Sequence, residues 1–113
     1  MGITGQDFQM WQGEDEVIEV PITDGESPVN LTGATVTWKL SQSGVTVLTK
    51  TTSDDITIGA GDAVGDLVTI AVRKANTATL SPGYYTHECR VVSGGDEQVV
   101  FTGTMRLIES LTL

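Results

Sequence analysis

A proline–glycine turn that runs directly into a long β-branched and aromatic segment constrains the fold of this chain more than any other feature. Pro82 presets one backbone dihedral and Gly83 tolerates a positive φ angle, so the chain reverses here. Residues 84–92 then read as a strand, whose successive side chains point to opposite faces of a sheet. Four side chains share the face that we expect to be buried: Tyr85, His87, Cys89 and Val91.

Alternation of apolar and polar residues recurs along the rest of the chain. It is clearest in residues 16–22 and residues 34–40, where the second segment places Val36, Trp38 and Leu40 on one face. Further strands are expected at residues 45–50, 67–72 and 99–107, with a brief strand at Ile56 and Ile58, a helical turn within residues 73–80 and a hairpin turn at Gly94 and Gly95.

About seven antiparallel strands with turn residues between them, and no long helical period, are typical of a β-sandwich. The 113 residues suit a single domain with one core. In immunoglobulin-like sandwiches a tyrosine just inside a strand turns its hydroxyl back to the preceding corner, and a tryptophan is buried beside it. Tyr85 and Trp38 fit these two roles. We therefore predict an all-β, immunoglobulin-like β-sandwich that spans residues 1–113.

The charge balance excludes several classes of partner. The formal net charge is -9, and the six basic residues form no cluster that could neutralise phosphates. Nucleic acid and anionic membranes are therefore not expected as partners. Residues 1–7 lack the basic segment and long apolar run of a signal peptide, so we expect a chain made in the cytoplasm. Its one cysteine cannot form an internal disulfide.

Few residues offer catalytic chemistry. His87 and Cys89 would point the same way from a strand, which makes a thiolate–imidazole pair conceivable, but a buried cysteine usually behaves as a small hydrophobe. Residues 14–16 (Glu-Asp-Glu) could form an acid/base pair of carboxylates or a solvated edge that resists strand addition. We expect no catalytic site and no enzyme.

Metal binding has one candidate. Asp54, Asp55, Asp62 and Asp66 flank a glycine-rich segment, and oxygen ligands on loops suit Ca²⁺. Their spacing is not that of an EF-hand loop, and the alternative is a solvated acidic loop. One histidine and one cysteine cannot supply a zinc ligand set. We expect no metal and no cofactor.

Several turn-and-strand elements, taken in order, resemble a family of phage virion domains. These elements are residues 10–15 (MWQGED), 24–33 (from DG to PVNLTG), 75–85 (ANTATLSPGYY) and 101–107 (FTGTMRL). The family is the amino-terminal immunoglobulin-like domain of baseplate upper proteins and related short tail and head accessory proteins. The resemblance implies a structural role in a tailed-phage virion, with other virion proteins as partners and several symmetric copies in the particle.

Such a role requires a surface that binds another protein. Phe8, Met10 and Trp11 cluster ahead of the first clear strand, and buried aromatic side chains dominate most protein interfaces. We therefore expect these three residues to contact a partner in the tail or baseplate. Two alternatives stay open: decoration of the capsid exterior, and a carbohydrate-binding module in which Trp11 and Tyr84 form a sugar platform.

Overall fold

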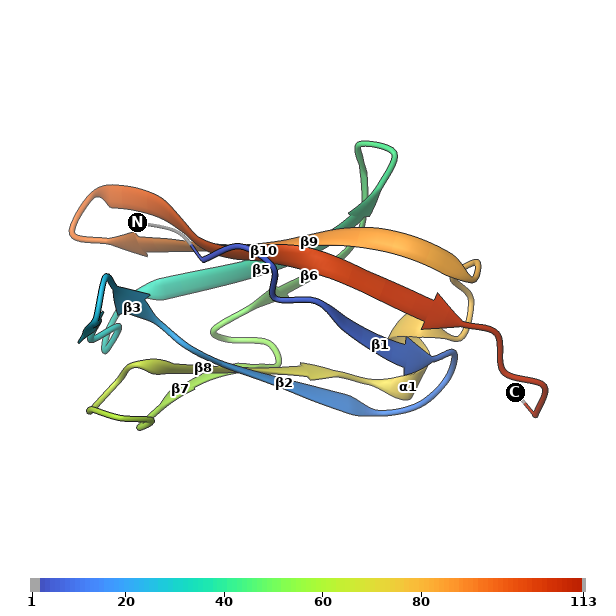
Figure 1. The fold of residues 1–113 in the computed structure, drawn as a ribbon, viewed down its shortest axis with the longest axis horizontal. Helices are drawn as coiled ribbons and strands as arrows, with labels where there is room; N and C mark the ends of the chain where they lie inside the picture. Colours follow the sequence, from blue (N-terminus) through green and yellow to red (C-terminus); the bar gives the residue numbers. More distant parts are fainter. Residues whose placement is uncertain (1–2, 113) are drawn as a thin grey trace.

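The computed structural model describes residues 3–112, which contain ten strands and one helical turn joined by loops (Figure 1). Met1, Gly2 and Leu113 lie outside the described residues. Residues 1–7, where no signal peptide is expected, are therefore described only from Ile3 onward. The elements are β1 (Phe8–Trp11), β2 (Glu16–Pro21), β3 (Thr23–Asp24), β4 (Ser27–Pro28), β5 (Thr35–Gln42), β6 (Val45–Thr51), β7 (Ile56–Gly59), β8 (Leu67–Val72), α1 (Lys74–Thr77), β9 (Gly83–Ser93) and β10 (Asp96–Ile108).

Two sheets lie face to face and enclose the core between them (Figure 1). The larger sheet has the order β1-β10-β9-β5-β6, and the smaller has the order β2-β8-β7. A separate two-stranded ribbon joins β3 to β4. The largest fully buried side chains come from both main sheets and from the link between β2 and β3: Trp38, Phe101, Met10, Ile22, Leu40, Ile56 and Ile70. This arrangement confirms the predicted immunoglobulin-like β-sandwich.

All seven strands expected from the alternation are present, but three others are not predicted by it. The additional strands β1, β3 and β4 have only two to four residues each, too few for a period to show. β1 also pairs with β10 in parallel, from Phe8 opposite Met105 to Trp11 opposite Ile108, so the sandwich is not purely antiparallel. The alternation predicts no strand before residue 16, so β1 is an addition to the predicted set.

The predicted tyrosine corner is present. The Tyr85 hydroxyl donates a 2.6 Å hydrogen bond to the Ser81 carbonyl oxygen, while its ring lies in the core with 3% of the residue exposed. Its neighbour Tyr84 points outward and is 67% exposed. The bond ties the start of β9 to the turn that follows α1.

His87 occupies the centre of the core, where many immunoglobulin-like domains place a disulfide cysteine, two residues after the corner tyrosine. Trp38 on β5 donates from Nε1 to His87 Nδ1 across 3.1 Å. Because Nδ1 accepts, the neutral ring carries its proton on Nε2, which donates to the Gln6 carbonyl oxygen at 2.6 Å. His87 therefore joins the core to the amino-terminal segment through two hydrogen bonds rather than a disulfide.

Replacing Tyr85 with phenylalanine is expected to cost about 1–2 kcal/mol of folding free energy, because the Ser81 carbonyl loses its donor. The measurement is urea denaturation followed by tryptophan fluorescence. Tyr84→Phe is the matched control, and it should be nearly neutral because the Tyr84 ring is exposed. A larger loss for the Tyr84 variant would contradict the assignment of the corner.

Candidate protein-binding surface

β1 carries the three residues expected to contact a partner. Because successive side chains of the strand point to opposite faces, these residues differ in exposure. Trp11 points outward and is 51% exposed. Phe8 is half-buried and packs edge-on against His87, with 5.2 Å between the ring centroids. Met10 faces inward and is only 1% exposed, so its side chain belongs to the core. The expectation of an accessible Met10 is corrected, because its position in β1 turns it toward the smaller sheet.

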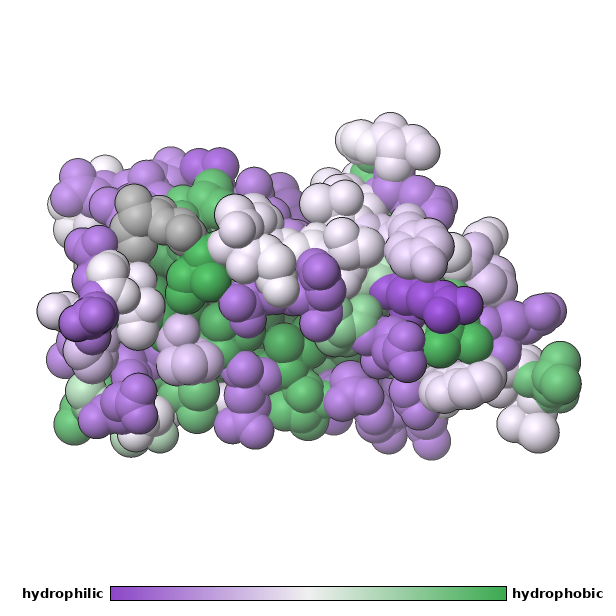
Figure 2. All heavy atoms as spheres, in the orientation of Figure 1, coloured by the Kyte–Doolittle hydropathy of each residue, from purple (hydrophilic) through white to green (hydrophobic). Residues whose placement is uncertain are grey.

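Trp11 lies beside a second exposed apolar residue that the sequence did not single out. Leu111 is 93% exposed and follows the end of β10, where it lines one hollow of about 440 Å³ with Trp11. We call this surface the terminal patch: Trp11, Gln12, Gly13, Glu14, Ser110, Leu111 and Thr112. In Figure 2 apolar atoms are exposed at this end of the molecule, where β1 and β10 finish.

The backbone beneath the terminal patch is held by the Gln12 side chain. Its Nε2 donates to the Leu80 carbonyl oxygen at 2.7 Å, and its Oε1 accepts from the Ser110 amide at 3.2 Å. The Gln12 amide also donates to the Ile108 carbonyl oxygen at 2.9 Å. One side chain thus connects β1, the turn after α1 and the segment after β10. A surface whose backbone is already ordered loses less entropy when a partner binds.

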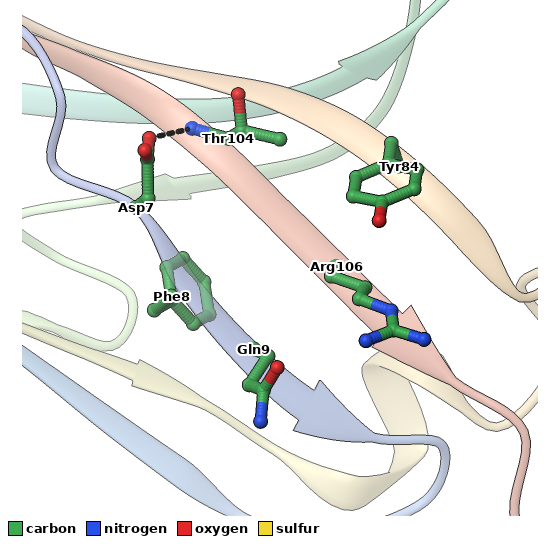
Figure 3. Close-up of a pocket in the computed structure, with 6 residues that line it drawn as sticks. All are labelled: Asp7, Phe8, Gln9, Tyr84, Thr104 and Arg106. Carbon is green, nitrogen blue, oxygen red and sulfur yellow. Dashed lines mark hydrogen bonds between the residues drawn. The ribbon is translucent and has the colours of Figure 1, made fainter.

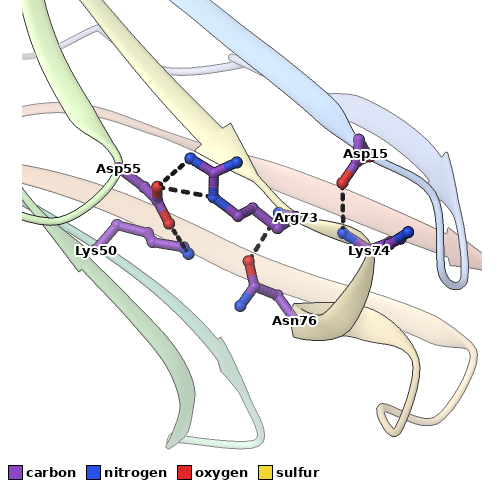
Figure 4. Close-up of polar contacts among 6 residues, drawn as sticks. All are labelled: Asp15, Lys50, Asp55, Arg73, Lys74 and Asn76. Atoms are coloured by element: carbon purple, nitrogen blue, oxygen red, sulfur yellow. Dashed lines mark hydrogen bonds and ion pairs between the residues drawn. The ribbon is translucent and has the colours of Figure 1, made fainter.

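Glu14 and Asp15 each bind a backbone amide and do not form a paired carboxylate site. Glu14 Oε1 accepts from the Trp11 amide at 2.8 Å and closes the turn after β1. Asp15 Oδ1 accepts from the Lys74 amide at 2.8 Å, at the start of α1 (Figure 4). These two carboxylates face different backbone partners. They do not converge on one point as an acid/base pair would.

A shallow groove runs along the outer face of the larger sheet, next to the terminal patch (Figure 3). It has a volume of about 470 Å³ and is lined by Asp7, Phe8, Gln9, Tyr84, Thr104 and Arg106. Arg106 is opposite Gln9 on one side and Tyr84 on the other. Asp7 Oδ1 accepts from the Thr104 amide at 2.8 Å, so one carboxylate oxygen is fixed to β10. The groove therefore offers an exposed aromatic ring beside a guanidinium.

His87 and Cys89 do not form a nucleophilic pair. Both are fully buried on the inward face of β9, as predicted, and His87 uses both ring nitrogens for structural hydrogen bonds. Burial raises the pKa of the Cys89 thiol to about 12, so the thiolate needed for nucleophilic attack does not form near neutral pH. Burial also lowers the pKa of His87, which favours its neutral form.

The acidic residues considered for calcium are dispersed, and two of them are structural. Asp66 is fully buried and accepts from the backbone amides of Gly61, Asp62 and Ala63. Asp55 binds Lys50 at 2.6 Å and Arg73 at 2.7 Å (Figure 4). No group of three or more candidate metal ligands occurs among residues 3–112. The interpretation of these residues as a solvated loop is corrected for both Asp55 and Asp66.

Asp55 matters because Lys50 is buried with it. The Lys50 side chain is only 4% exposed, and a buried ammonium requires a partner charge. Hydrogen bonds from Arg73 and then from Lys50 lower the pKa of Asp55 from 3.8 to about 2. Because the folded-state pKa is below the ordinary value, the ion pairs add stability that is complete above pH 4 and lost as the pH falls toward 2.

We therefore expect Asp55→Asn to lower the melting temperature at pH 7 and to converge with the unmodified chain as the pH falls from about 4 to 2. Asparagine tolerates the positive φ of 68° at this position, so the backbone is not strained by the change. Thermal melts at several pH values measure the effect. Asp54→Asn, at the exposed neighbour, is the matched control and should be neutral; an equal loss in both variants would contradict the role of the ion pairs.

The strand order, the tyrosine corner and the buried Trp38 define this chain as an immunoglobulin-like β-sandwich. A solved structure of the N-terminal domain of phage TP901-1 ORF48 aligns with 96% of this chain and 94% of that chain, at 13% identity and a TM-score of 0.55. Murine CRIg aligns with 93% of this chain and 92% of that chain, at 13% identity and a TM-score of 0.41.

The chain therefore shares its fold with a domain of a phage protein. No protein-family model matches the sequence, and no curated protein is significantly similar to it. Within residues 3–112, no helix is both long enough and apolar enough to cross a membrane.

Proposed function

We propose that this chain is a non-enzymatic structural component of a tailed-phage virion and that it acts by binding other virion proteins. The terminal patch carries the proposal, because it combines two exposed apolar side chains, Trp11 and Leu111, with a backbone fixed by Gln12. A large aromatic side chain on an ordered backbone is typical of the residues that dominate binding energy. The fold shared with a phage protein domain supports the same role.

Within the virion we propose a tail or baseplate position, where the chain anchors or joins larger components. Decoration of the capsid exterior is the alternative, and both positions are compatible with an acidic surface that packaged DNA would repel. The proposed partners are other virion proteins, contacted by several symmetric copies of the chain. Binding to separately purified tail, baseplate and capsid proteins distinguishes the two positions.

A carbohydrate-binding module is less well supported by the exposed side chains. Stacking on sugars along a platform requires a row of exposed aromatic rings. Among residues 3–112 only Trp11 and Tyr84 are aromatic and largely exposed, and only Tyr84 lines the groove of Figure 3. We therefore place protein association first.

Trp11→Ala is expected to weaken binding to the virion partner by about 2 kcal/mol or more and to change the stability of the chain little. The assay is a titration of the variant against each purified virion protein, with thermal melts in parallel. Leu111→Ala should weaken the same contact. Val64→Ala is the control, because Val64 is 73% exposed on the loop before β8, at the other end of the sandwich.

Two results would oppose the proposal. Unimpaired binding by both the Trp11 and Leu111 variants would move the interface away from the terminal patch. A fall in the melting temperature of Trp11→Ala as large as that of a core variant would instead assign Trp11 to the core.

A further inference from the structure

The edge strands of the two main sheets differ in how they are protected from pairing with another chain. The edges are β1 and β6 in the larger sheet and β2 and β7 in the smaller. β2 carries Glu16 and Glu19 and ends at Pro21, while β1 and β7 have only four residues each. Charge, proline and short length all oppose the addition of a further strand.

β6 has none of these three protections. It is seven residues long, and its exposed residues are uncharged: Val45, Thr46, Val47 and Thr49. Its only charged residue, Lys50, is buried and paired with Asp55. Among the described residues, the backbone of residues 45–49 is hydrogen-bonded to β5 alone, so one side of the strand is free.

One feature of β6 does modify its edge. A β-bulge at Val47 separates the pair Leu40 and Leu48 from the pair Ser41 and Thr46, and a bulge bends and twists its strand. The turn of this hairpin rises away from the body of the sandwich (Figure 1), and its tip is pale, without strongly hydrophilic residues, in Figure 2. Val47, the residue at the bulge, is 37% exposed.

Charge indicates which molecule can approach this edge. The chain has 15 acidic residues, but residues 31–53 contain none and include two lysines, Lys39 and Lys50. Two copies with a net charge of -9 each repel wherever their carboxylates meet. The β5–β6 hairpin is an acid-free surface on which two copies can approach without that repulsion.

We propose that two copies of this chain associate through β6, which pairs antiparallel with β6 of the second copy. Such a contact is symmetric, supplies backbone partners to both free edges and closes after two molecules. It joins the two larger sheets into one continuous sheet. β1 lies at the opposite edge of the same sheet, so both terminal patches stay free, and the dimer does not depend on the virion contact proposed above.

The test is the concentration dependence of molecular mass for the full chain, measured by sedimentation equilibrium from micromolar to millimolar concentration. The unmodified chain should form a dimer. Val47→Glu should raise the dissociation constant about tenfold or more, because it places like charges at the shared edge. Thr49→Glu, at a second exposed position on β6, should have the same effect.

Val17→Glu is the matched control, since Val17 is 55% exposed on the β2 edge. It should leave the dimer unchanged, and thermal melts should show that all three variants fold. A monomer at millimolar concentration would overturn the proposal, as would a dimer that Val47→Glu does not weaken or that Val17→Glu weakens equally. If Val47→Glu or Thr49→Glu loses the dimer but still binds the virion partner, the result supports the dimer and leaves the proposed function in place.

Discussion

Replacing Trp38 with alanine is expected to lower the free energy of unfolding by about 3–5 kcal/mol, because it removes a large apolar side chain and leaves a cavity. Trp38 is completely buried at the centre of β5. Its loss also leaves His87 Nδ1 without the donor that it has at 3.1 Å. The measurement is urea denaturation followed by far-ultraviolet circular dichroism, which does not depend on the fluorescence of the removed residue.

A loss this large is a substantial part of the stability of a small domain, so a milder variant is needed. Trp38→Phe keeps an aromatic ring in the core but removes the Nε1 donor. It should therefore cost less free energy of unfolding than Trp38→Ala, and its cost should report the loss of the hydrogen bond between Trp38 Nε1 and His87 Nδ1. Trp11→Ala controls for the loss of a tryptophan in general. A cost under about 1 kcal/mol for Trp38→Ala would mean that β5 is shifted by one residue in its register.

The strands around Trp38 could be predicted because their burial follows their alternation. In β5 and β9 every second side chain enters the core, and His87 and Cys89 are buried as the pattern of β9 predicts. The sharp turn at Pro82 and Gly83 made the corner tyrosine identifiable as well. Local sequence is sufficient where a strand is long and one of its faces is buried.

The terminal patch could be predicted only in part, because it depends on contacts between the two ends of the chain. Trp11 is recognisable as an aromatic residue ahead of a strand. That Leu111 lies beside it follows from the parallel pairing of β1 with β10 and from the Gln12 hydrogen bonds to Leu80 and Ser110, which no local pattern indicates. Met10 was misplaced because β1 is too short for its alternation to be recognised.

The burial of the Lys50 charge could not be predicted from the local sequence either. Lys50 and Asp55 are five residues apart in a segment that reads as a strand followed by a polar loop, and Arg73 joins them from the end of β8. Alternation alone gives no reason to bury a lysine. Its burial becomes favourable only when the fold brings a carboxylate to it.

The second large effect is expected at Gly103, where the amino-terminal segment crosses β10. A Cβ atom on residue 103 would collide with the carbonyl group of Gln6 and approach His87 Nε2 to 2.7 Å. Gln6 is held there by its own amide, which donates to the Thr102 carbonyl oxygen at 3.0 Å, and by His87. The nearest obstacle is therefore backbone, which cannot move aside as the end of a flexible side chain could.

Gly103→Ala should therefore displace residues 3–6 from β10 and lower the free energy of unfolding by about 2–4 kcal/mol, from overpacking and from an unpaired N–H on buried His87. Hydrogen exchange locates the effect, because the Thr102 amide is bonded to the Ile3 carbonyl oxygen at 2.9 Å and should lose its protection. Gly59→Ala is the matched control, since a Cβ at residue 59 meets no atom within 4 Å. Full stability of Gly103→Ala, with the Thr102 amide still protected, would contradict this prediction, because it would show that a Cβ atom at residue 103 does not displace the amino-terminal segment.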